Sequence, residues 1–256
     1  MATQSGTVQA DVAELQRQRL RSIAIVPARN EEASLGPLLA EIRAAEPDLG
    51  IVVINDGSTD ATAQVAAAAR VPVVNLPFNV GIGGTVQTGY QYALEHGYDI
   101  AIQVDGDGQH DPSEIGHVLE PILEDRADLV VGTRFVSGGG YRGTRLRRVG
   151  IRIFANVVSL MVGQRVSDTT SGFRAVNRKA LRLFAAQYPH DYPEVESIVL
   201  LSRHGLRMLE VPVQMRVRET GASSITALSA AYYMIKVLLA LFIGLFRRYP
   251  TPQEEQ

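Results

Sequence analysis

Short apolar runs alternate with helix-forming stretches over the first half of the chain, and this alternation restricts the possible folds more than any other feature. Runs rich in β-branched residues occur at residues 22–27, 51–54, 100–104 and 129–131. A short apolar run bounded by turn residues is typical of a buried parallel strand. The repeated order of strand, loop and helix therefore predicts an α/β fold, with a mostly parallel sheet and helices on both faces.

The alternation ends near Gly132, and the rest of the chain has a different organisation. We expect a helix ending near Val162, a turn-rich stretch at residues 168–174, a helix at 194–203 and a strand at 206–217. The length of 256 residues suits one α/β domain with an appendage. The predicted division is a polar leader at 1–21, the α/β domain at 22–224, an apolar segment at 225–249 and a polar tail at 250–256.

Composition excludes several kinds of site. The chain has no cysteine, which excludes disulfides, thiolate metal sites and cysteine nucleophiles. Its 25 basic and 27 acidic residues give a net charge of -2, so nothing indicates binding to nucleic acid. Residues 1–21 lack a continuous apolar run and contain Asp11 and Glu14, unlike a secretion signal. We therefore expect a cytoplasmic location.

Acidic and amide side chains follow the third of these apolar runs at alternate positions. They are Asp105, Asp107 and Gln109. An isolated Asp-Gly-Asp is usually a turn. After a buried strand, however, alternate oxygen ligands could face a hard cation, and Mg²⁺ or Mn²⁺ fits best. The adjacent His110 is interpreted as a hydrogen-bonded structural group and not as a ligand.

Two further loops carry polar residues at the same predicted edge of the sheet. Asp56 is placed to accept hydrogen bonds from a base or ribose, while Asp60 is expected to cap the following helix. The glycines at 81, 83 and 84 leave two alternatives open. They could bring backbone N–H groups to a phosphate, or they could form a tight turn.

Arginines cluster after Gly132, beside the presumed active edge. They are Arg134, Arg145, Arg147, Arg148 and Arg152. The helix dipole does not favour positively charged side chains at the start of a helix. A solvated charge run is the usual explanation, but an anionic acceptor would favour planar guanidinium groups, and we prefer this second interpretation.

Several motifs together make the chain resemble the family 2 inverting glycosyltransferases. They are Pro27-Ala-Arg-Asn-Glu31, Asn55-Asp-Gly-Ser-Thr-Asp60, Asp105-Gly-Asp-Gly-Gln109, Gly132-Thr-Arg134, Asp168-Thr-Thr-Ser-Gly-Phe-Arg174, and Glu210-Val-Pro-Val213 through Arg218-Glu-Thr-Gly-Ala-Ser223. Within that family the chain is most similar to dolichyl-phosphate mannose synthase and the bacterial polyprenyl-phosphate sugar synthases.

The resemblance implies a Rossmann-like GT-A fold and a set of site residues. The nucleotide-sugar donor, GDP- or UDP-linked, would be bound by Pro27, Arg29, Glu31, Asp56 and Asp105, and its diphosphate would contact Arg218. The cation, Mg²⁺ or Mn²⁺, would be held by Asp105, Asp107 and Gln109. The acceptor phosphate would be bound by Arg134 and Arg148. Two positions depart from the family pattern, which usually has lysine at the place of Ser224 and arginine at that of Ile153.

The acceptor decides which residues count as catalytic. A lipid phosphate is already anionic, so Asp107 and Arg134 would act mainly by positioning and charge neutralisation. A hydroxyl acceptor needs a base, for which Asp168 is the best available residue, although Asp168 could equally organise its turn. A nucleotidyltransferase and a non-catalytic sugar-nucleotide sensor are alternatives from other classes. The former usually shows a Gly-rich, basic signature after the first strand, which is absent here.

The apolar segment between Ala227 and Phe246 has the length of a bilayer span but contains Lys236. The segment is followed by Arg247 and Arg248, which suits a helix lying on the surface of an anionic membrane. We predict peripheral attachment to the inner face of the cell membrane. The alternative is a helix that packs on the catalytic domain or on a second subunit of a homo-oligomer.

Overall fold

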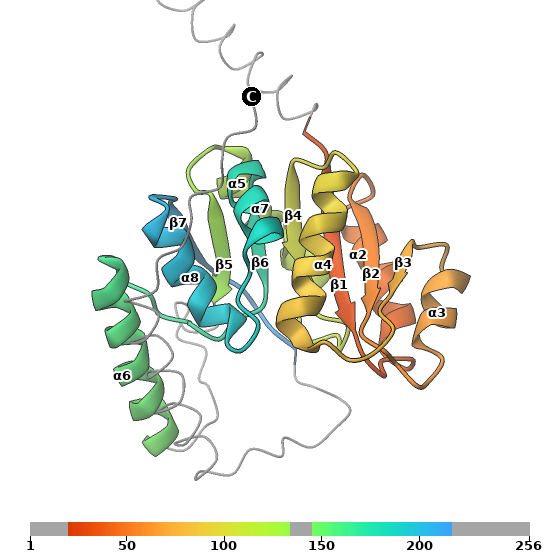
Figure 1. Cartoon of the computed structure of the whole chain (residues 1–256), viewed down its shortest axis with the longest axis horizontal. Helices are drawn as coiled ribbons and strands as arrows, with labels where there is room; N and C mark the ends of the chain where they lie inside the picture. Colours follow the sequence, from red (N-terminus) through yellow and green to blue (C-terminus); the bar gives the residue numbers. More distant parts are fainter. Residues whose placement is uncertain (1–19, 134–144, 217–256) are drawn as a thin grey trace, which may run out of the picture.

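The computed structural model of the chain describes residues 20–133 and 145–216, with the backbone alone at 145–153 (Figure 1). Its elements are β1 (Ser22–Ala28), α2 (Leu35–Ala45), β2 (Gly50–Asn55), α3 (Thr62–Ala68), β3 (Val73–Asn75), α4 (Gly81–Glu95), β4 (Ile100–Gln103), the short 3₁₀ helix η1 (Pro112–Glu114), α5 (Ile115–Leu123), β5 (Leu129–Thr133), α6 (Arg145–Val162), β6 (Arg174–Val176), α7 (Arg178–Ala186), α8 (Pro193–Arg203) and β7 (Met208–Pro212).

The strands form one sheet in the order β3-β2-β1-β4-β6-β5-β7. All neighbouring pairs are parallel except those of β6, which runs antiparallel to both β4 and β5. Arg174 at the start of β6 pairs with Gln103 at the end of β4 and with Val131 of β5. The loop that enters β6 therefore lies at the same edge as the carboxyl ends of the parallel strands.

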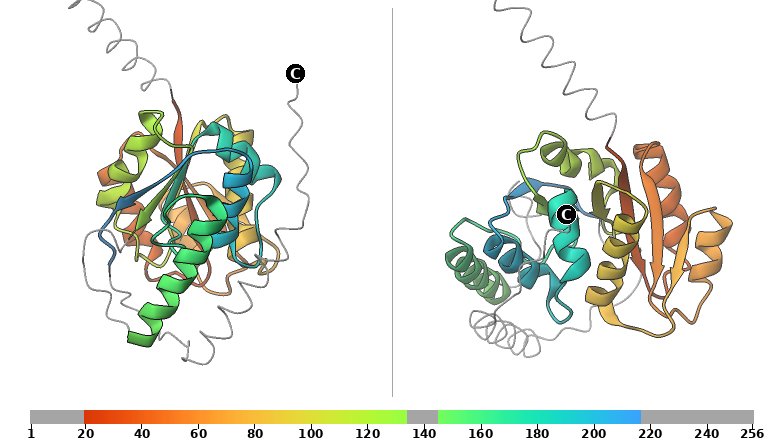
Figure 2. Two further views of the ribbon diagram at one scale, coloured as in Figure 1. Left: turned by 90° about the vertical axis from the view of Figure 1, so that its left-hand side faces the viewer. Right: turned by 45° about the horizontal axis from the view of Figure 1, so that its top comes forward.

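Helices cover both faces of the sheet, as the alternation in the sequence predicts. Successive residues of a strand point to opposite faces. In β1, Ile23 and Ile25 pack in a cluster with residues of α4, α7 and α8, whereas Ala24 and Val26 pack with α2, α3 and α5. Figures 1 and 2 show the two helical layers, with α6 beside α8 at the β7 end of the sheet.

The structure differs from the sequence-based expectation after residue 168. The stretch expected to contain only turns includes the start of β6, and α7 follows it without having been predicted. The strand expected at 206–217 is limited to Met208–Pro212, because its hydrogen-bonded pairing with β5 ends at Pro212. The leader and the apolar segment at 225–249 lie outside the described residues. Within residues 20–133 and 145–216, no helix combines the length and hydropathy needed to cross a bilayer.

Candidate functional site

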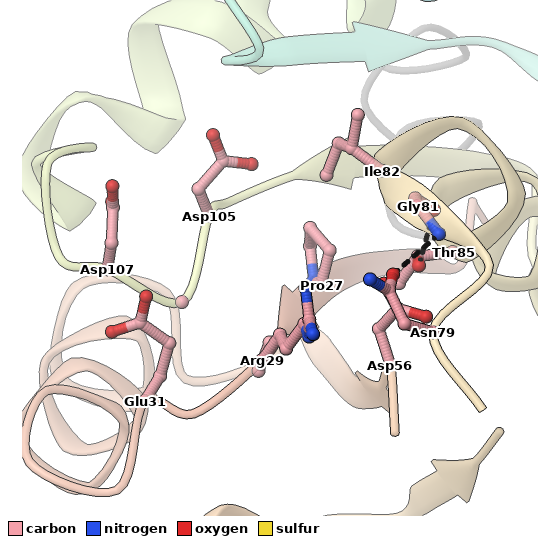
Figure 3. A pocket seen from close by; sticks show the side chains of 12 residues that line it. Pro27, Arg29, Glu31, Asp56, Asn79, Gly81, Ile82, Thr85, Asp105 and Asp107 are labelled. Carbon is pink, nitrogen blue, oxygen red and sulfur yellow. Dashed lines mark hydrogen bonds between the residues drawn. The ribbon is translucent and has the colours of Figure 1, made fainter. Parts of the chain in front are cut away.

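The loops that follow β1, β2 and β4 meet the start of α4 around a cavity of about 360 Å³. Such a crevice at the carboxyl ends of parallel strands is the usual ligand site of an open α/β sheet. Its walls are formed by Pro27, Ala28, Arg29, Glu31, Asp56, Asn79, Gly81, Ile82, Thr85, Asp105, Gly106 and Asp107. Figure 3 shows Asp105 and Asp107 at one end of the cavity, and Asp56 and Asn79 at the other.

Hydrogen bonds join the loops after β1 and β2, both of which contribute residues to the cavity wall. Asn30 has a φ of 55°, a backbone region that asparagine tolerates better than most residues. Its Oδ1 accepts a hydrogen bond from the Thr59 N–H at 2.9 Å, and its own N–H donates to Ser58 Oγ at 3.0 Å. The Glu31 N–H donates to Thr62 Oγ1. Sequence reasoning did not single out Asn30 or Thr59, because such pairing depends on where two distant loops meet.

Asp56 joins the end of β2 to the start of α4. Its side chain is 5% exposed, and Oδ1 accepts a hydrogen bond from the Val80 N–H at 2.7 Å. Asp60, in the same loop, accepts a hydrogen bond at 3.0 Å from the N–H of Thr62, the first residue of α3, although the N-cap position itself is occupied by Ala61. Of these two carboxylates, only Asp56 lines the cavity.

The acidic loop after β4 is held by its own side chains and by His110. The Gln103 amide donates to Asp105 Oδ1 at 2.8 Å, and the Gln109 N–H donates to Asp107 Oδ1 at 3.0 Å. His110 is 4% exposed, accepts a hydrogen bond from the Asp105 N–H at its Nδ1 and stacks on Phe173 with ring centroids 4.8 Å apart. The prediction that His110 is a hydrogen-bonded structural group is therefore confirmed.

The cavity is strongly acidic and has oxygen donors suited to a hard cation. Among the described residues, four carboxylates line it, from Glu31, Asp56, Asp105 and Asp107, together with one guanidinium, from Arg29. Among the described residues, no group of three or more His, Cys, Asp or Glu side chains is arranged to hold a metal ion. Asp105 and Asp107 therefore fit a cation that takes its remaining ligands from a bound molecule and water, as Mg²⁺ commonly does.

Gln109, also predicted as a metal ligand, is absent from the cavity wall. Its described contacts are made by the backbone, whose N–H donates to Asp107 Oδ1 and whose carbonyl accepts from the Arg216 N–H. Gln109 thus orients the Asp107 carboxylate through its backbone N–H.

The structure gives Gly83 and Gly84, both within α4, a role that neither interpretation anticipated. A Cβ on Gly83 would lie 2.4 Å from the Pro189 carbonyl oxygen, and a Cβ on Gly84 would lie 2.9 Å from a Val80 methyl carbon. Both glycines are therefore required for close packing inside the protein. Gly81 differs, because it lines the cavity, has a φ of 81° and would meet nothing within 4 Å.

Asp168 lies in the turn before β6 and is 1% exposed. Its Oδ1 accepts hydrogen bonds from the N–H and the hydroxyl of Thr170, both at 3.0 Å, and its N–H donates to Glu210. The residue does not line the cavity. This geometry favours the alternative that Asp168 organises its turn.

Gly172 leaves room for the Asp105 carboxylate, and its replacement is a direct test of that arrangement. A Cβ at this position would lie 3.0 Å from Asp105 Oδ2 and 2.9 Å from Gln103 Nε2. We expect Gly172→Ala to weaken Mn²⁺ binding about tenfold, since the carboxylate must turn away from the cavity. Calorimetric titration with Mn²⁺ measures this. Gly36→Ala is the control, because its Cβ would meet only a Val65 methyl at 3.5 Å. Equal Mn²⁺ affinity in both variants would contradict the assignment.

Three predicted site residues lie where the structure gives no side-chain geometry. Arg134 and Arg218 fall outside the described residues. Arg148 belongs to the first turns of α6, which confirms the predicted helix there, but its side chain is not described. Their roles remain predictions.

Known proteins share both the sequence pattern and the fold. The profile of the family described as "Glycosyl transferase family 2" matches residues 23–184. The chain is 30% identical over 227 residues to the polyprenol monophosphomannose synthase of Mycolicibacterium smegmatis, covering 85% of each chain. It is 32% identical over 216 residues to the undecaprenyl-phosphate mannosyltransferase of Micrococcus luteus, covering 81% of this chain and 88% of that protein.

Among solved structures, glucosyl-3-phosphoglycerate synthase of Mycobacterium tuberculosis, crystallised with Mn²⁺ and UDP-glucose, superposes with a TM-score of 0.68 at 21% identity. The match covers 91% of this chain and 82% of that one, and it shows a GT-A-like fold. Because the family profile spans well over half of the chain, the protein is a glycosyltransferase and belongs to glycosyl transferase family 2.

Proposed function

We propose that this glycosyltransferase moves a hexose from a nucleotide-diphosphate sugar to a polyprenyl phosphate, with Mg²⁺ or Mn²⁺ in the cavity. The observation that carries the proposal is the cavity itself, where Asp105 and Asp107 lie at one end and the buried Asp56 at the other. A nucleotide-sugar is elongated and has a flat base with polar edges, a polar ribose and a charged diphosphate. Such a ligand can place its nucleoside at Asp56 and its diphosphate at Asp105 and Asp107.

Electrostatics support the requirement for a cation. Among the residues that the structure describes, four carboxylates and one guanidinium line the cavity, so a bound cation would offset the repulsion between these carboxylates and a diphosphate. Asp105 and Asp107 are the residues that would hold the cation, which supplies positive charge to the diphosphate and to the departing nucleoside diphosphate. The solved relative crystallised with Mn²⁺ and UDP-glucose is consistent with this choice.

The names of the relatives support a lipid-phosphate acceptor. One relative is named as a synthase of polyprenol monophosphomannose, and the other as an undecaprenyl-phosphate mannosyltransferase. A phosphate oxygen is anionic at neutral pH, so it can attack the anomeric carbon without a strong base. This is compatible with an Asp168 carboxylate that is bonded within its turn. Peripheral attachment of residues 225–249 to the inner face of the membrane would bring such an acceptor to the enzyme.

Arg134, Arg148 and Arg218 complete the proposed site. The described part of the chain ends at Arg216, whose guanidinium contacts Glu41 and Asp111 and whose N–H donates to the Gln109 carbonyl at 2.9 Å. These contacts hold the chain beside the acidic loop two residues before Arg218. We propose that Arg218 contacts the donor diphosphate, and that Arg134 and Arg148 bind the acceptor phosphate.

The function is tested with radiolabelled UDP- and GDP-hexoses, a polyprenyl phosphate and the purified full-length protein. We expect labelled lipid to form with Mg²⁺ or Mn²⁺ and to fall to background with EDTA. Transfer to a free polyprenol, or to water alone, would contradict the phosphate acceptor. Binding of the nucleotide-sugar with no turnover on any acceptor would favour a non-catalytic sensor.

Arg148→Ala is expected to raise the KM for the polyprenyl phosphate about tenfold or more while leaving the KM for the donor within about twofold. The reason is that a phosphate clamp contacts only one substrate, and a charge-assisted hydrogen bond contributes about 1.5–3 kcal/mol. Initial rates with each substrate varied in turn measure both constants. Arg182→Ala, at an exposed position of α7, is the matched control. Equal changes in both KM values would move Arg148 out of the acceptor site.

A further inference from the structure

Exposed apolar side chains gather at one end of the cavity. Among the residues whose side chains the structure describes, the exposed large apolar ones are Leu20, Phe78, Val80, Ile82 and Leu160. Three of these five lie within one five-residue stretch, in the loop before α4 and in its first turn. We call Phe78, Val80 and Ile82 the apolar rim. Single exposed apolar residues are normal, but a group of them beside a ligand cavity indicates an interaction surface.

The loop after β2 holds the backbone of the apolar rim in place. Gly57 in that loop has a φ of 62°, and a Cβ there would lie 2.8 Å from the Phe78 carbonyl carbon. The Val80 N–H donates to Asp56 Oδ1 at 2.7 Å. Phe78 is therefore 66% exposed in a loop that is braced from below. The Val80 N–H would also keep its acceptor on a surface from which water is excluded.

The stretch that carries the apolar rim has no charge. Residues 71–94 contain no Asp, Glu, Lys, Arg or His, in a chain of which 20% is charged. A partner recognised by its charge, such as an acidic peptide, would find no complementary group in this stretch. Near lipid acyl chains, by contrast, a charged side chain is costly and an apolar side chain gains free energy by leaving water. The composition therefore favours a lipid surface as the partner.

The described chain ends at the opposite end of the cavity from Asn79, which lies within the apolar rim (Figure 3). The N–H of Arg216, the last described residue, donates to the Gln109 carbonyl in the acidic loop. The apolar segment at 225–249 begins nine residues later, and nine residues span at most about 30 Å. The segment for which we propose membrane attachment is thus tethered to the acidic end, and the apolar rim adjoins the other end.

We propose that the apolar rim inserts into the boundary between headgroups and acyl chains of the leaflet that contains the polyprenyl phosphate. The inference rests on the proposed lipid-phosphate acceptor. It gives the catalytic domain a membrane contact of its own, separate from residues 225–249. The phosphate of such an acceptor lies in the headgroup layer, so the cavity must come close to that layer for transfer. Phe78 has the largest and most exposed side chain of the three, and it gains most from insertion.

Phe78→Trp tests the contact directly, because the chain contains no other tryptophan. The full-length variant is mixed with vesicles of phosphatidylcholine and phosphatidylglycerol in equal parts, with and without brominated acyl chains. We expect a blue shift of the tryptophan emission and strong quenching by the brominated lipid. Glu95→Trp, at an exposed position at the other end of α4, is the matched control and should show neither effect.

Three outcomes of this experiment would overturn the inference. One is emission from Phe78→Trp that vesicles leave unchanged, and another is equal quenching of Phe78→Trp and Glu95→Trp. The third is a blue shift that needs no vesicles and grows with protein concentration, which would assign the apolar rim to contact between two copies of the chain.

Phe78→Ser tests the consequence for sugar transfer. We expect the apparent KM for polyprenyl phosphate in vesicles to rise about tenfold, because an aromatic ring no longer inserts. The KM for the nucleotide-sugar, and the rate with a water-soluble short-chain polyprenyl phosphate, should stay close to those of the wild type. An unchanged KM in vesicles, or equal losses with both acceptors, would overturn the inference. Failure of the wild type to use either acceptor would instead overturn the proposed function, whatever the tryptophan emission shows.

Discussion

Exchange of Asp107 for asparagine is expected to lower sugar transfer about a hundredfold at limiting Mn²⁺, while the protein stays folded. An amide has one oxygen and no charge, so it is a poor ligand for a hard cation. Asp107 is partly exposed at the cavity wall, and asparagine has nearly the same size and keeps an oxygen that can accept the hydrogen bond from the Gln109 N–H. Its loss therefore changes the site and leaves the core intact.

The dependence on Mn²⁺ concentration separates this explanation from a general defect. We expect excess Mn²⁺ to restore part of the rate in Asp107→Asn, with a circular dichroism spectrum and unfolding temperature like those of the wild type. Asp48→Asn is the control, since it makes the same chemical change at an exposed position that does not line the cavity. Wild-type turnover of Asp107→Asn at limiting Mn²⁺ would falsify the assignment.

Asp128→Ala is expected to lower the free energy of unfolding by about 3 kcal/mol, because it removes a buried carboxylate and the hydrogen bonds that this carboxylate accepts from three donors. Asp128 is 3% exposed. Its carboxylate accepts hydrogen bonds from the Arg207 N–H at 2.7 Å, from Arg207 Nε at 3.2 Å and from the Asn177 amide at 2.7 Å. One carboxylate thus joins the starts of β5 and β7 to the start of α7. Urea unfolding at pH 7 measures the loss.

The comparison with Asp125→Asn shows whether burial is the cause, since asparagine tolerates the φ of 52° at this position better than alanine does. The Asp125 side chain is 81% exposed and contacts the same Arg207 guanidinium, at 2.6 Å. Removing this exposed carboxylate should cost less than about 1 kcal/mol. Similar losses in the two variants would contradict the prediction.

Asp128 also predicts a pH dependence of stability. Burial alone would raise the pKa of Asp128, but hydrogen bonds from Arg207 and Asn177 outweigh it and lower the pKa below the ordinary value. A carboxyl whose pKa is lower in the folded protein stabilises it above the unfolded-state pKa, and that contribution disappears as the pH falls through the folded-state pKa. The wild type should therefore lose stability below about pH 4 more steeply than Asp128→Ala. Unfolding measured over this acid range checks the sign.

The parallel half of the fold is predictable because its signals are local. The strands β1, β2, β4 and β5 are continuous apolar runs, since helices cover both of their faces. The topology then brings the residues that follow three of these strands, among them Asp56 and Asp105, to one cavity. This much of the site follows from the order of strands and helices alone.

What could not be predicted depends on contacts between distant segments. The strand β6 has only three residues, and its Arg174 is 1% exposed, with its guanidinium bonded to the Ser171 carbonyl and the Ser197 hydroxyl. A charged residue in so short a run does not indicate a central strand. Asn30 carries no signal either, because its role comes from the N–H of Thr59, in a distant loop, that its side chain binds.

The insertion of β6 between β4 and β5 has a consequence for the growing polypeptide on the ribosome. The first four strands, β3, β2, β1 and β4, can pair with one another as soon as β4 has emerged. One side of β4 must then wait until β6 has been synthesised, after β5 and α6. During that interval β4 presents an open, apolar edge, which is the kind of surface that pairs with other chains. Nascent chains that stall between β5 and β6 should therefore be the aggregation-prone species of this protein.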